Sequence, residues 1–362
     1  MKTLRSSWER IVRSSAIPLA AIVLALLLGA LILAVSGANP WQTYSALASG
    51  AFGSEQAIGR TLEKATPLIF SGLAVAFAFK AGLFNIGAQG QLLIGAITAA
   101  WLGFAITGLP AFIHAPLALL GGAAAGALYA AIPGALKTYT GAHEVITTIM
   151  LNFVAINITD FLADGPLKDP SPTNIVARTP KILETAAIPR LGAYLPLGFV
   201  LAVLMAILAW YLLWKTTPGF AIRIVGLNPN AARYAGIAVG RTVIFTMMLS
   251  GFLAGMGGAV ESLGVVGRYQ PGFNVGLGFD GITIALLGKT HPFGVIPAAL
   301  LVGAMRAGSS RMQFNAGVAP EIIDVVLALM LFLVAAEMIV RWIIRLRATD
   351  EEQVTLSTGW GK

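Results

Sequence analysis

The stretch Lys215–Arg241, KTTPGFAIRIVGLNPNAARYAGIAVGR, separates two apolar segments of the chain. Those segments are Leu195–Trp214 and Thr242–Leu263, and each is long enough to cross a bilayer as a helix, which takes about 20 residues. The polar stretch between them must face water. It has four basic residues and no acidic residue, which by the positive-inside tendency predicts that it lies in the cytoplasm.

A short capped helix is predicted inside this stretch. Asn228 is a suitable N-cap, Pro229 suits the first helical position, and Gly236 suits the stop that follows. A helix held between two spans is able to transmit a push across the membrane boundary. The simpler interpretation, a solvated connector without a role of its own, remains open at this point.

Composition places the chain among polytopic helical membrane proteins. Its 362 residues are 57% hydrophobic and 11% charged, with a mean hydropathy of +0.81, which is far from the composition of soluble domains. The 41 glycines allow close helix packing in lipid, and Gly122-xxx-Gly126 and Gly251-xxx-Gly255 are candidate contacts. The net charge of +8 comes from basic residues that flank the spans, so it indicates topology and no nucleic-acid surface.

The hydropathy pattern predicts an all-α fold of about ten spans, with eight or nine as a variant. The eighth is an apolar piece of eight residues, too short to cross alone, so either it begins near Gly272 or it is a broken, re-entrant element. The predicted spans are Ala16–Val35, Ala65–Gly82, Gly90–Thr107, His114–Leu136, Glu144–Leu162, Leu195–Trp214, Thr242–Leu263, Gly281–Gly288, Pro292–Ala307 and Pro320–Val340.

The segments outside this 16–340 transmembrane domain follow from the same pattern. Residues 1–15 form a basic cytoplasmic N-terminus, residues 163–193 a long extracytoplasmic loop, and residues 341–362 a cytoplasmic tail. The first apolar run could be a cleaved signal peptide, but it is longer than such regions usually are, so we expect a retained span. Trp41, Tyr44 and Phe52 suit an interfacial helix after it.

Polar residues within the spans mark the candidate solute pathway, because they are costly in hydrocarbon. Glu144, Thr148, Asn152 and Thr159 share one face of the fifth span. Their side chains either form hydrogen bonds between helices or line a pathway in which they bond to a sugar or a base. For Glu144, near the expected cytoplasmic entrance, we expect a structural or gating ion pair.

Two further sites extend this candidate pathway. The turn Phe84–Gln91, FNIGAQGQ, has glycines that permit unwound backbone, and the amides of Asn85, Gln89 and Gln91 both donate and accept hydrogen bonds. This turn is as suitable for a gate as for a binding site. On the seventh span Ser250, Ala254, Gly257 and Glu261 share a face, which favours close packing first and a cavity wall second.

Motifs for catalysis, nucleotides and metals are weak here. Gly276–Gly281 matches a dinucleotide fingerprint but follows no predicted strand, and Gly288-Lys289-Thr290 lacks the first glycine of a phosphate loop, since Thr283 stands there. The three histidines have no metal-ligand spacing, and no catalytic constellation lies in a plausible cleft. We therefore expect no catalytic residue, no metal and no cofactor bound by this chain.

Four stretches together resemble permease subunits of ATP-binding-cassette importers of the nucleoside and simple-sugar branch. They are Lys80–Gln91 (KAGLFNIGAQGQ), Gly141–Asn152 (GAHEVITTIMLN), Gly219–Gly240 and Gly272–Gly294. The resemblance implies an internal pseudo-repeat and makes the polar loop the coupling segment to the ATPase. It differs at Gln89, where Glu is frequent in the family. The coupling residues it implies are Arg223, Gly226, Asn228, Pro229, Arg233, Tyr234 and Gly236.

The resemblance also implies partners and a place of action. These are a cytoplasmic ATPase subunit that carries ATP and Mg²⁺, a second permease chain that is a homologue or a copy, and an extracytoplasmic substrate-binding protein. The expected location is the bacterial cytoplasmic membrane with both termini inside. Purine nucleosides are the expected solutes. The alternatives are a simple sugar or autoinducer, and an ATP-independent channel or carrier.

Overall fold

The computed structural model describes residues 2–171, 174–191, 194–272 and 276–336. Within them, eight helices are long and apolar enough to cross a membrane, and α11 and α13 are shorter apolar helices. The long ones are α1 (Lys2–Val35), α3 (Glu55–Lys80), α4 (Ala88–Ala105), α5 (Ala111–Thr140), α6 (Glu144–Asp164), α7 (Leu197–Lys215), α10 (Val239–Glu261) with its continuation η2 (Ser262–Val266), and α12 (Pro292–Ala316). The predicted all-α polytopic fold is confirmed.

The remaining elements are short. They are α2 (Pro40–Phe52), η1 (Glu184–Ala186), β1 (Arg190–Leu191), β2 (Leu195–Pro196), α8 (Thr217–Leu227), α9 (Pro229–Tyr234), α11 (Leu277–Leu287) and α13 (Ile322–Ala335). The two strands pair antiparallel. The eighth predicted span is thus an 11-residue helix, as expected for a broken element. Residues 337–340 of the predicted last span and the tail 341–362 lie outside the described residues.

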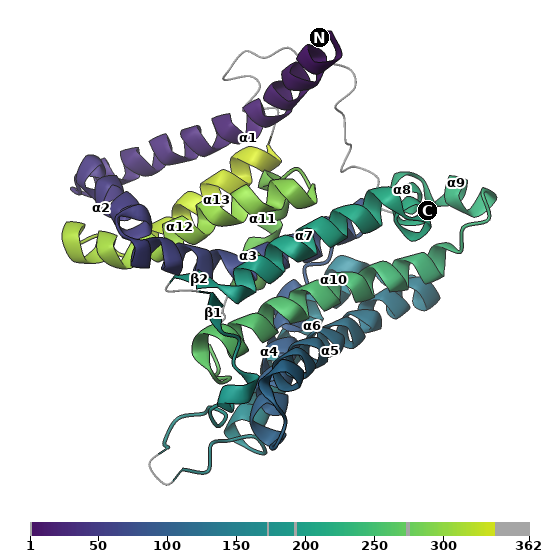
Figure 1. Ribbon diagram of the computed structural model, residues 1–362. Coiled ribbons are helices and arrows are strands. Elements are labelled where there is room, and N and C mark those ends of the chain that lie inside the picture. The colour runs from purple at the N-terminus through teal and green to yellow at the C-terminus, as the bar shows by residue number, and fades with distance from the viewer. Residues whose placement is uncertain (1, 172–173, 192–193, 273–275, 337–362) are drawn as a thin grey trace. The chain divides into compact units, whose positions relative to one another are not determined.

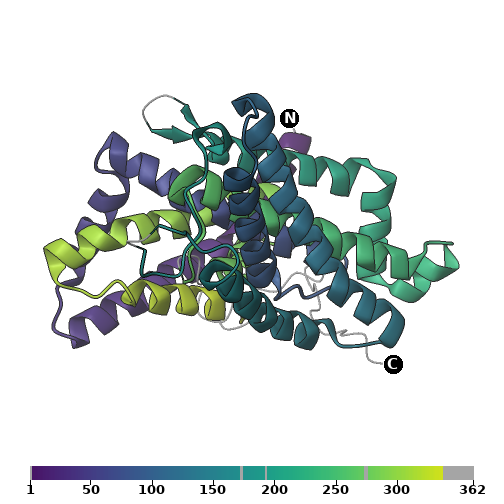
Figure 2. The same cartoon turned by 90° about the horizontal axis from the view of Figure 1, so that it is seen from below.

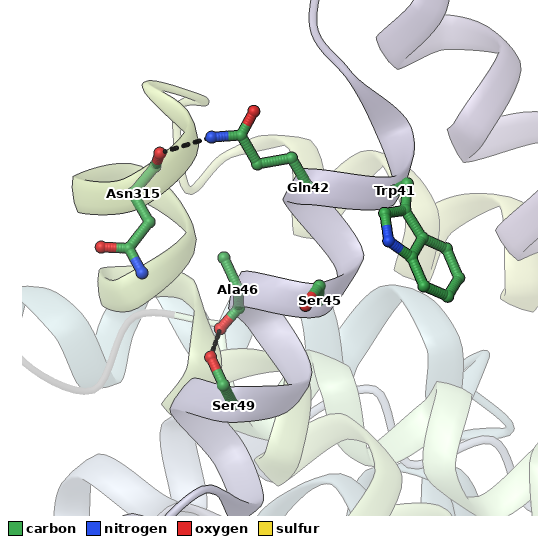
Figure 3. Close-up of a pocket in the computed structure, with 6 residues that line it drawn as sticks. All are labelled: Trp41, Gln42, Ser45, Ala46, Ser49 and Asn315. Carbon is green, nitrogen blue, oxygen red and sulfur yellow. Dashed lines mark hydrogen bonds between the residues drawn. The ribbon is translucent and has the colours of Figure 1, made fainter.

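Two compact units make up the chain, and each is described by itself. The first comprises residues 1–50 and 308–362, and in it α1 contacts α2 and α13. The Tyr44 hydroxyl donates a hydrogen bond to the carbonyl oxygen of Leu26 at 2.7 Å. The Gln42 amide of α2 donates to the Asn315 carbonyl at 3.1 Å, beside a shallow hollow (Figure 3). That hollow is lined by Trp41, Gln42, Ser45, Ala46, Ser49 and Asn315.

The second unit, residues 51–307, is built around α10, which packs on α3, α4 and α5 (Figure 1 and Figure 2). Small residues allow this close approach. A Cβ on Gly126 of α5 would lie 2.8 Å from the Cα of Gly255 of α10, closer than real side chains come. The two predicted small-residue motifs therefore pack against each other. Helices in lipid associate through such close van der Waals contacts, because no hydrophobic driving force brings them together there.

Two boundary predictions were wrong. The ninth span was expected to end at Ala307, but α12 continues to Ala316. The second span was expected to begin near Ala65, but α3 begins at Glu55. Ser54 caps it by accepting a hydrogen bond from the amide of Ala57 at 3.1 Å, and the Thr61 hydroxyl donates to the Ala51 carbonyl at 2.8 Å. The polar residues before the span are thus helical because a cap and a buried hydrogen bond hold them, which hydropathy does not reveal.

The predicted coupling segment holds two helices. Asn228 caps α9, because its side chain accepts hydrogen bonds from the amides of Asn230 and Ala231, each at 3.0 Å. Gly236 takes the left-handed conformation at φ 77°, so the predicted capped helix is confirmed. An additional helix, α8, precedes it. Both lie at one end of α7, and β1 and β2 lie at its other end (Figure 1).

Candidate functional site

The turn between α3 and α4 is fixed by one buried asparagine. The Asn85 amide nitrogen donates to Gln91 Oε1 and to Ser250 Oγ, both at 2.8 Å. Its oxygen accepts from Gln91 Nε2 at 3.0 Å and from the backbone amide of Gly87 at 3.1 Å. The Ser250 hydroxyl in turn donates to the Ala74 carbonyl at 2.6 Å. We call Asn85, Gln91 and Ser250, together with Asn152, whose contacts to the same turn are described next, the Asn85 network.

Asn152 ties α6 to the same turn. Its amide donates to the Ile86 carbonyl at 2.9 Å, and its oxygen accepts from the amide of Gly90 at 2.8 Å. A third contact comes from Gln89, whose Oε1 accepts from the amide of Gly278 at the start of α11, also at 2.8 Å. The network therefore joins α3, α4, α6 and α10, and Gln89 adds α11, around one irregular turn.

The other predicted pathway residues mostly bond within their own helix, although the Thr159 side chain also hydrogen-bonds to that of Tyr269. The hydroxyls of Thr148 and Thr159 donate to carbonyls of their own helix, those of Glu144 at 2.7 Å and Ala155 at 2.9 Å. The ring of Phe84 packs on Phe79, with centroids 4.9 Å apart. These contacts make the turn a packed structural centre in the described conformation. Its role in lining a pathway stays a prediction.

Glu144 forms the ion pair that the sequence led us to expect. Its carboxylate lies 2.6 Å from the Lys137 ammonium group of α5, and the two side chains are 7% and 12% exposed. A second pair of similar length joins Asp280 of α11 to Arg306 of α12. Both carboxylates lie within the first turn of their helices, where a negative charge is favourable.

Glu261 stands apart from the network. It is 5% exposed and ends α10, 11 residues after Ser250, which is about 16 Å along a helix. Among the described residues it forms no hydrogen bond and no ion pair. Lys64 and Glu63 of α3 interact with it electrostatically, but the Glu63 carboxylate is paired with Arg190 at 2.9 Å.

The backbone directly after Glu261 is unusual. Ser262–Val266 forms a π-helix, a rare conformation that is frequent at functional sites. The Ser262 hydroxyl is buried and has no hydrogen-bond partner in the described part of the chain. The amide of Ile188, from the loop 163–193, donates to the Leu263 carbonyl at 3.0 Å and covers this segment. Glu261 and Ser262 thus keep hydrogen-bonding capacity that the Asn85 network has used up.

Ser262 was missed in the sequence, where nothing distinguishes it from the small polar residues common in membrane helices. The π-helix has no sequence signature that would have drawn attention to it. Its position directly after Glu261, already a candidate, was the one signal present.

The coupling segment combines an exposed tip with a buried attachment. Tyr234 is 94% exposed and Arg233 is exposed beside it. Gly226 of α8 approaches the end of α3 so closely that a Cβ there would lie 2.9 Å from the carbonyl carbon of Ala81. Arg223 lies 5.9 Å from the ring centroid of Trp214. A displacement of the tip would therefore reach the α3–α4 turn through Gly226.

Comparison with known proteins gives the family. The family model described as branched-chain amino acid transport system / permease component matches residues 57–335. The chain belongs to this family.

Three relatives match most of the chain. The guanosine ABC transporter permease protein NupP of Bacillus subtilis is 43% identical, over 90% of this chain and 94% of its own length. The nucleoside ABC transporter permease protein NupB of Lactococcus lactis is 36% identical, over 91% and 92%. The glucose ABC transporter permease protein TsgB13 of Haloferax volcanii is 32% identical, over 90% and 88%.

A more distant match reaches a second B. subtilis protein of similar name. The guanosine ABC transporter permease protein NupQ is 32% identical, over 67% of this chain and 78% of its own length.

Proposed function

We propose that this chain is the membrane-spanning permease subunit of an ATP-driven importer of nucleosides, with purine nucleosides such as guanosine and adenosine as solutes. The observation that carries the proposal is the 43% identity to a guanosine permease protein across 90% of the chain. The second relative, named a nucleoside permease, supports the same solute class.

A simple sugar is the second candidate. The relative named a glucose permease covers as much of the chain, at 32% identity. A nucleoside carries a ribose, so a pathway that bonds sugar hydroxyls serves both solute classes. The base is what distinguishes them, and the uptake experiment below uses that difference.

Within this proposal, Glu261 and Ser262 contact the solute. A carboxylate accepts hydrogen bonds from two neighbouring hydroxyls, and a serine hydroxyl both donates and accepts. An intramembrane carboxylate is costly unless it has a partner or a function, and Glu261 forms no ion pair among the described residues. The Asn85 network, by contrast, would have to break its own hydrogen bonds to bind a solute, so it serves as the frame.

The segment with α8 and α9 couples transport to ATP hydrolysis. The exposed Arg233 and Tyr234 present a cation and a phenol to an ATPase subunit on the cytoplasmic side, and Gly226 transmits the displacement to the end of α3. Binding of ATP and Mg²⁺ to that partner then shifts the population between outward-open and inward-open states. This chain supplies the pathway and its partner supplies the hydrolysis.

The partners follow from the family. An ATPase subunit and an extracytoplasmic substrate-binding protein complete an ABC importer. The second permease chain of the complex is a homologue, in line with the two B. subtilis guanosine permease proteins that both resemble this chain. The importer lies in the bacterial cytoplasmic membrane with both termini of this chain inside.

Uptake of labelled guanosine, adenosine, ribose and glucose by cells with and without the gene tests the solute and the energy source. We expect gene-dependent uptake of the nucleosides that stops when ATP is depleted. Uptake of the sugars alone would make the second candidate correct. Gene-dependent uptake that persists without ATP would identify a channel or a secondary carrier.

The coupling assignment has its own test. Arg233→Glu should abolish ATP-driven uptake while the chain still inserts and assembles, because the change reverses the charge of the exposed tip. The exposed Arg241→Glu, just beyond the tip, is the matched control. Unchanged uptake in the Arg233→Glu variant would show that the tip does not couple to the ATPase.

A further inference from the structure

A cluster of cations and aromatic rings lies where α7 ends, outside the solute pathway and outside the exposed tip. The Lys80 ammonium and the Arg223 guanidinium lie 5.7 and 5.9 Å from the ring centroid of Trp214. The Lys215 ammonium lies 5.7 Å from that of Trp210. His291, between α11 and α12, packs its ring 5.0 Å from Trp214. We call these six residues the Trp214 cluster.

The cations of the Trp214 cluster have no carboxylate partner in the described part of the chain. None of Lys80, Lys215 and Arg223 forms an ion pair there, and Arg223 Nε is buried without a hydrogen-bond partner. Lys80 and Arg223 repel each other. Stacking on an indole compensates in part, since a cation–π contact is worth about 0.5–2 kcal/mol. An anion placed between them would remove the repulsion and satisfy the free donor.

The position of the cluster along the spans indicates at which level of the membrane such an anion would bind. Lys80 ends the span α3, Trp214 and Lys215 end the span α7, and His291 precedes the span α12. Tryptophan and lysine at the ends of spans mark the level of the lipid headgroups. Burial, and then the charge of Lys80, hold the pKa of His291 below its usual range, so at neutral pH the imidazole adds no further charge.

An exposed apolar stripe on α7 leads directly to this cluster. Its residues recur at helical spacing along one face of the span, and Tyr211, one turn before Lys215, is 55% exposed. The stripe comprises Val200, Leu204, Ile207, Leu208 and Tyr211. The ring of Phe293 on α12 packs beside Trp210, with centroids 5.6 Å apart, and is also exposed. A surface suited to acyl chains thus ends at a group of unpaired cations.

We propose that the Trp214 cluster binds the phosphate of an anionic phospholipid, whose acyl chains lie along the α7 stripe. Arg223 and Lys80 hold the phosphate oxygens, Lys215 lies at the rim, and the indole rings mark the headgroup boundary. Basic pockets at the ends of membrane helices bind anionic headgroups by this chemistry. The bound lipid would brace α8 against the ends of α3 and α7, next to the Gly226 contact.

Retention of phosphatidylglycerol tests the proposal. The assembled importer is reconstituted in nanodiscs of phosphatidylcholine with a minority of phosphatidylglycerol, extracted in mild detergent, and analysed by native mass spectrometry. The double variant Lys80→Gln/Arg223→Gln should bind phosphatidylglycerol roughly 30-fold more weakly, because each basic group near an anionic headgroup contributes about one factor of five. Arg241→Gln removes one exposed charge from the first turn of α10 and should retain the lipid as the wild type does.

A variant that keeps both charges controls for the possibility that the Gln substitutions lower lipid binding by misfolding the chain. Lys80→Arg/Arg223→Lys should retain the lipid to within a few-fold, so loss in the Gln variant alone would report on charge. Equal retention by wild type and the Gln variant would overturn the proposal. A second measurement compares how far phosphatidylglycerol, inorganic phosphate and glycerol 3-phosphate each raise the melting temperature of the importer. Equal stabilisation by all three would also overturn the proposal, since the site would then be one for free anions. Weaker ATPase association with unchanged lipid retention would overturn it in favour of a protein contact.

Discussion

Buried polar groups differ between the middle of α10, at Ser250, and its C-terminal end, at Glu261 and Ser262. Near Ser250, every polar atom of the Asn85 side chain is hydrogen-bonded to a neighbouring helix or turn. At the C-terminal end, where the helix changes to π geometry, the Ser262 hydroxyl is buried without a hydrogen-bond partner in the described chain. Beside it Glu261 is 5% exposed and forms no ion pair with a described residue. The first arrangement fixes a structure, and the second keeps capacity for a ligand.

This difference teaches how to interpret polar residues in a membrane span. A polar group in hydrocarbon costs several kcal/mol when it has no hydrogen-bond partner. A group that is bonded to another helix is already compensated, so its presence in a span does not by itself indicate a function. An unsatisfied one requires either a ligand or water. The predictions below follow from this contrast, and they are ordered by the free energy that each interaction is expected to contribute, whether to stability or to solute binding.

Breaking the ion pair between α5 and α6 should have the largest effect. Lys137→Met leaves the Glu144 carboxylate buried without its 2.6 Å partner, and removal of one member of a buried pair costs about 3–5 kcal/mol. Thermal unfolding of the purified chain in detergent measures this loss. The exposed Lys181→Met is the control, and equal melting of both variants would show that the pair does not hold the fold.

Removing the centre of the Asn85 network should have the next largest effect. Asn85→Leu deletes four hydrogen bonds and strands Gln91 and the amide of Gly87. At about 0.6 kcal/mol for each bond in a membrane, the free energy of unfolding should fall by roughly 2–3 kcal/mol. The matched change Asn157→Leu, at an exposed asparagine that bonds only its own helix, should change it little. If the Asn85→Leu protein were stable but no longer supported uptake, the Asn85 network would have to be assigned to solute contact and not to the structural frame.

Ser262→Ala should behave in the opposite way. Because the hydroxyl has no partner in the described chain, its removal should leave stability unchanged or slightly raised. Guanosine uptake at low concentration should fall about twofold to tenfold, which corresponds to one hydrogen bond of about 0.5–1.5 kcal/mol. Reduced stability together with normal uptake would place Ser262 among the structural residues.

An extramembrane carboxylate offers the smallest effect. Hydrogen bonds from the hydroxyl and amide of Ser171, with the charges of Arg178 and Arg268, hold the pKa of Asp169 below its usual range. A lowered pKa in the folded state means that this contribution is present above the unfolded pKa, about 4, and is lost as the pH falls through the folded value. The protection factors of the amides in residues 163–171, which correct for the intrinsic pH dependence of exchange, should therefore fall in strong acid. In Asp169→Asn they should be low already at neutral pH, and identical pH profiles would contradict this.

Much of the frame could be predicted because it rests on local signals. The cap at Asn228, the stop at Gly236 and the broken element before Gly288 follow from residue type and segment length. Asn85, Gln91 and Asn152 were each predicted as candidate pathway residues, but the sequence did not predict that they meet at one turn. The bonds that hold them depend on contacts between residues far apart in the chain, such as the one from Asn85 to Ser250 across 165 positions, which periodicity does not reveal.

The features that carry the two proposals were harder to see. The π-helix at Ser262 arises from packing and leaves no pattern in the residues. Lys80 was predicted to lie at the end of a span, and Lys215 and Arg223 were predicted to lie in the loop that follows another span. Their convergence on Trp214 and Trp210 requires α3, α7 and α8 to meet. The prediction that the second span begins near Ala65 was wrong because hydropathy weighs polarity and ignores caps, and α3 begins at Glu55.

The most direct test is the concentration dependence of ATP-driven guanosine uptake into vesicles that contain the complete importer, with wild-type chain or Glu261→Gln. A charged hydrogen-bond acceptor contributes about 1.5–3 kcal/mol. The account therefore predicts a rise of roughly 10- to 100-fold in the half-saturating guanosine concentration, with a nearly unchanged maximal rate and melting temperature. The exposed Glu184→Gln should match the wild type. A Glu261→Gln curve that also overlays the wild type would contradict the assignment of Glu261 to the solute.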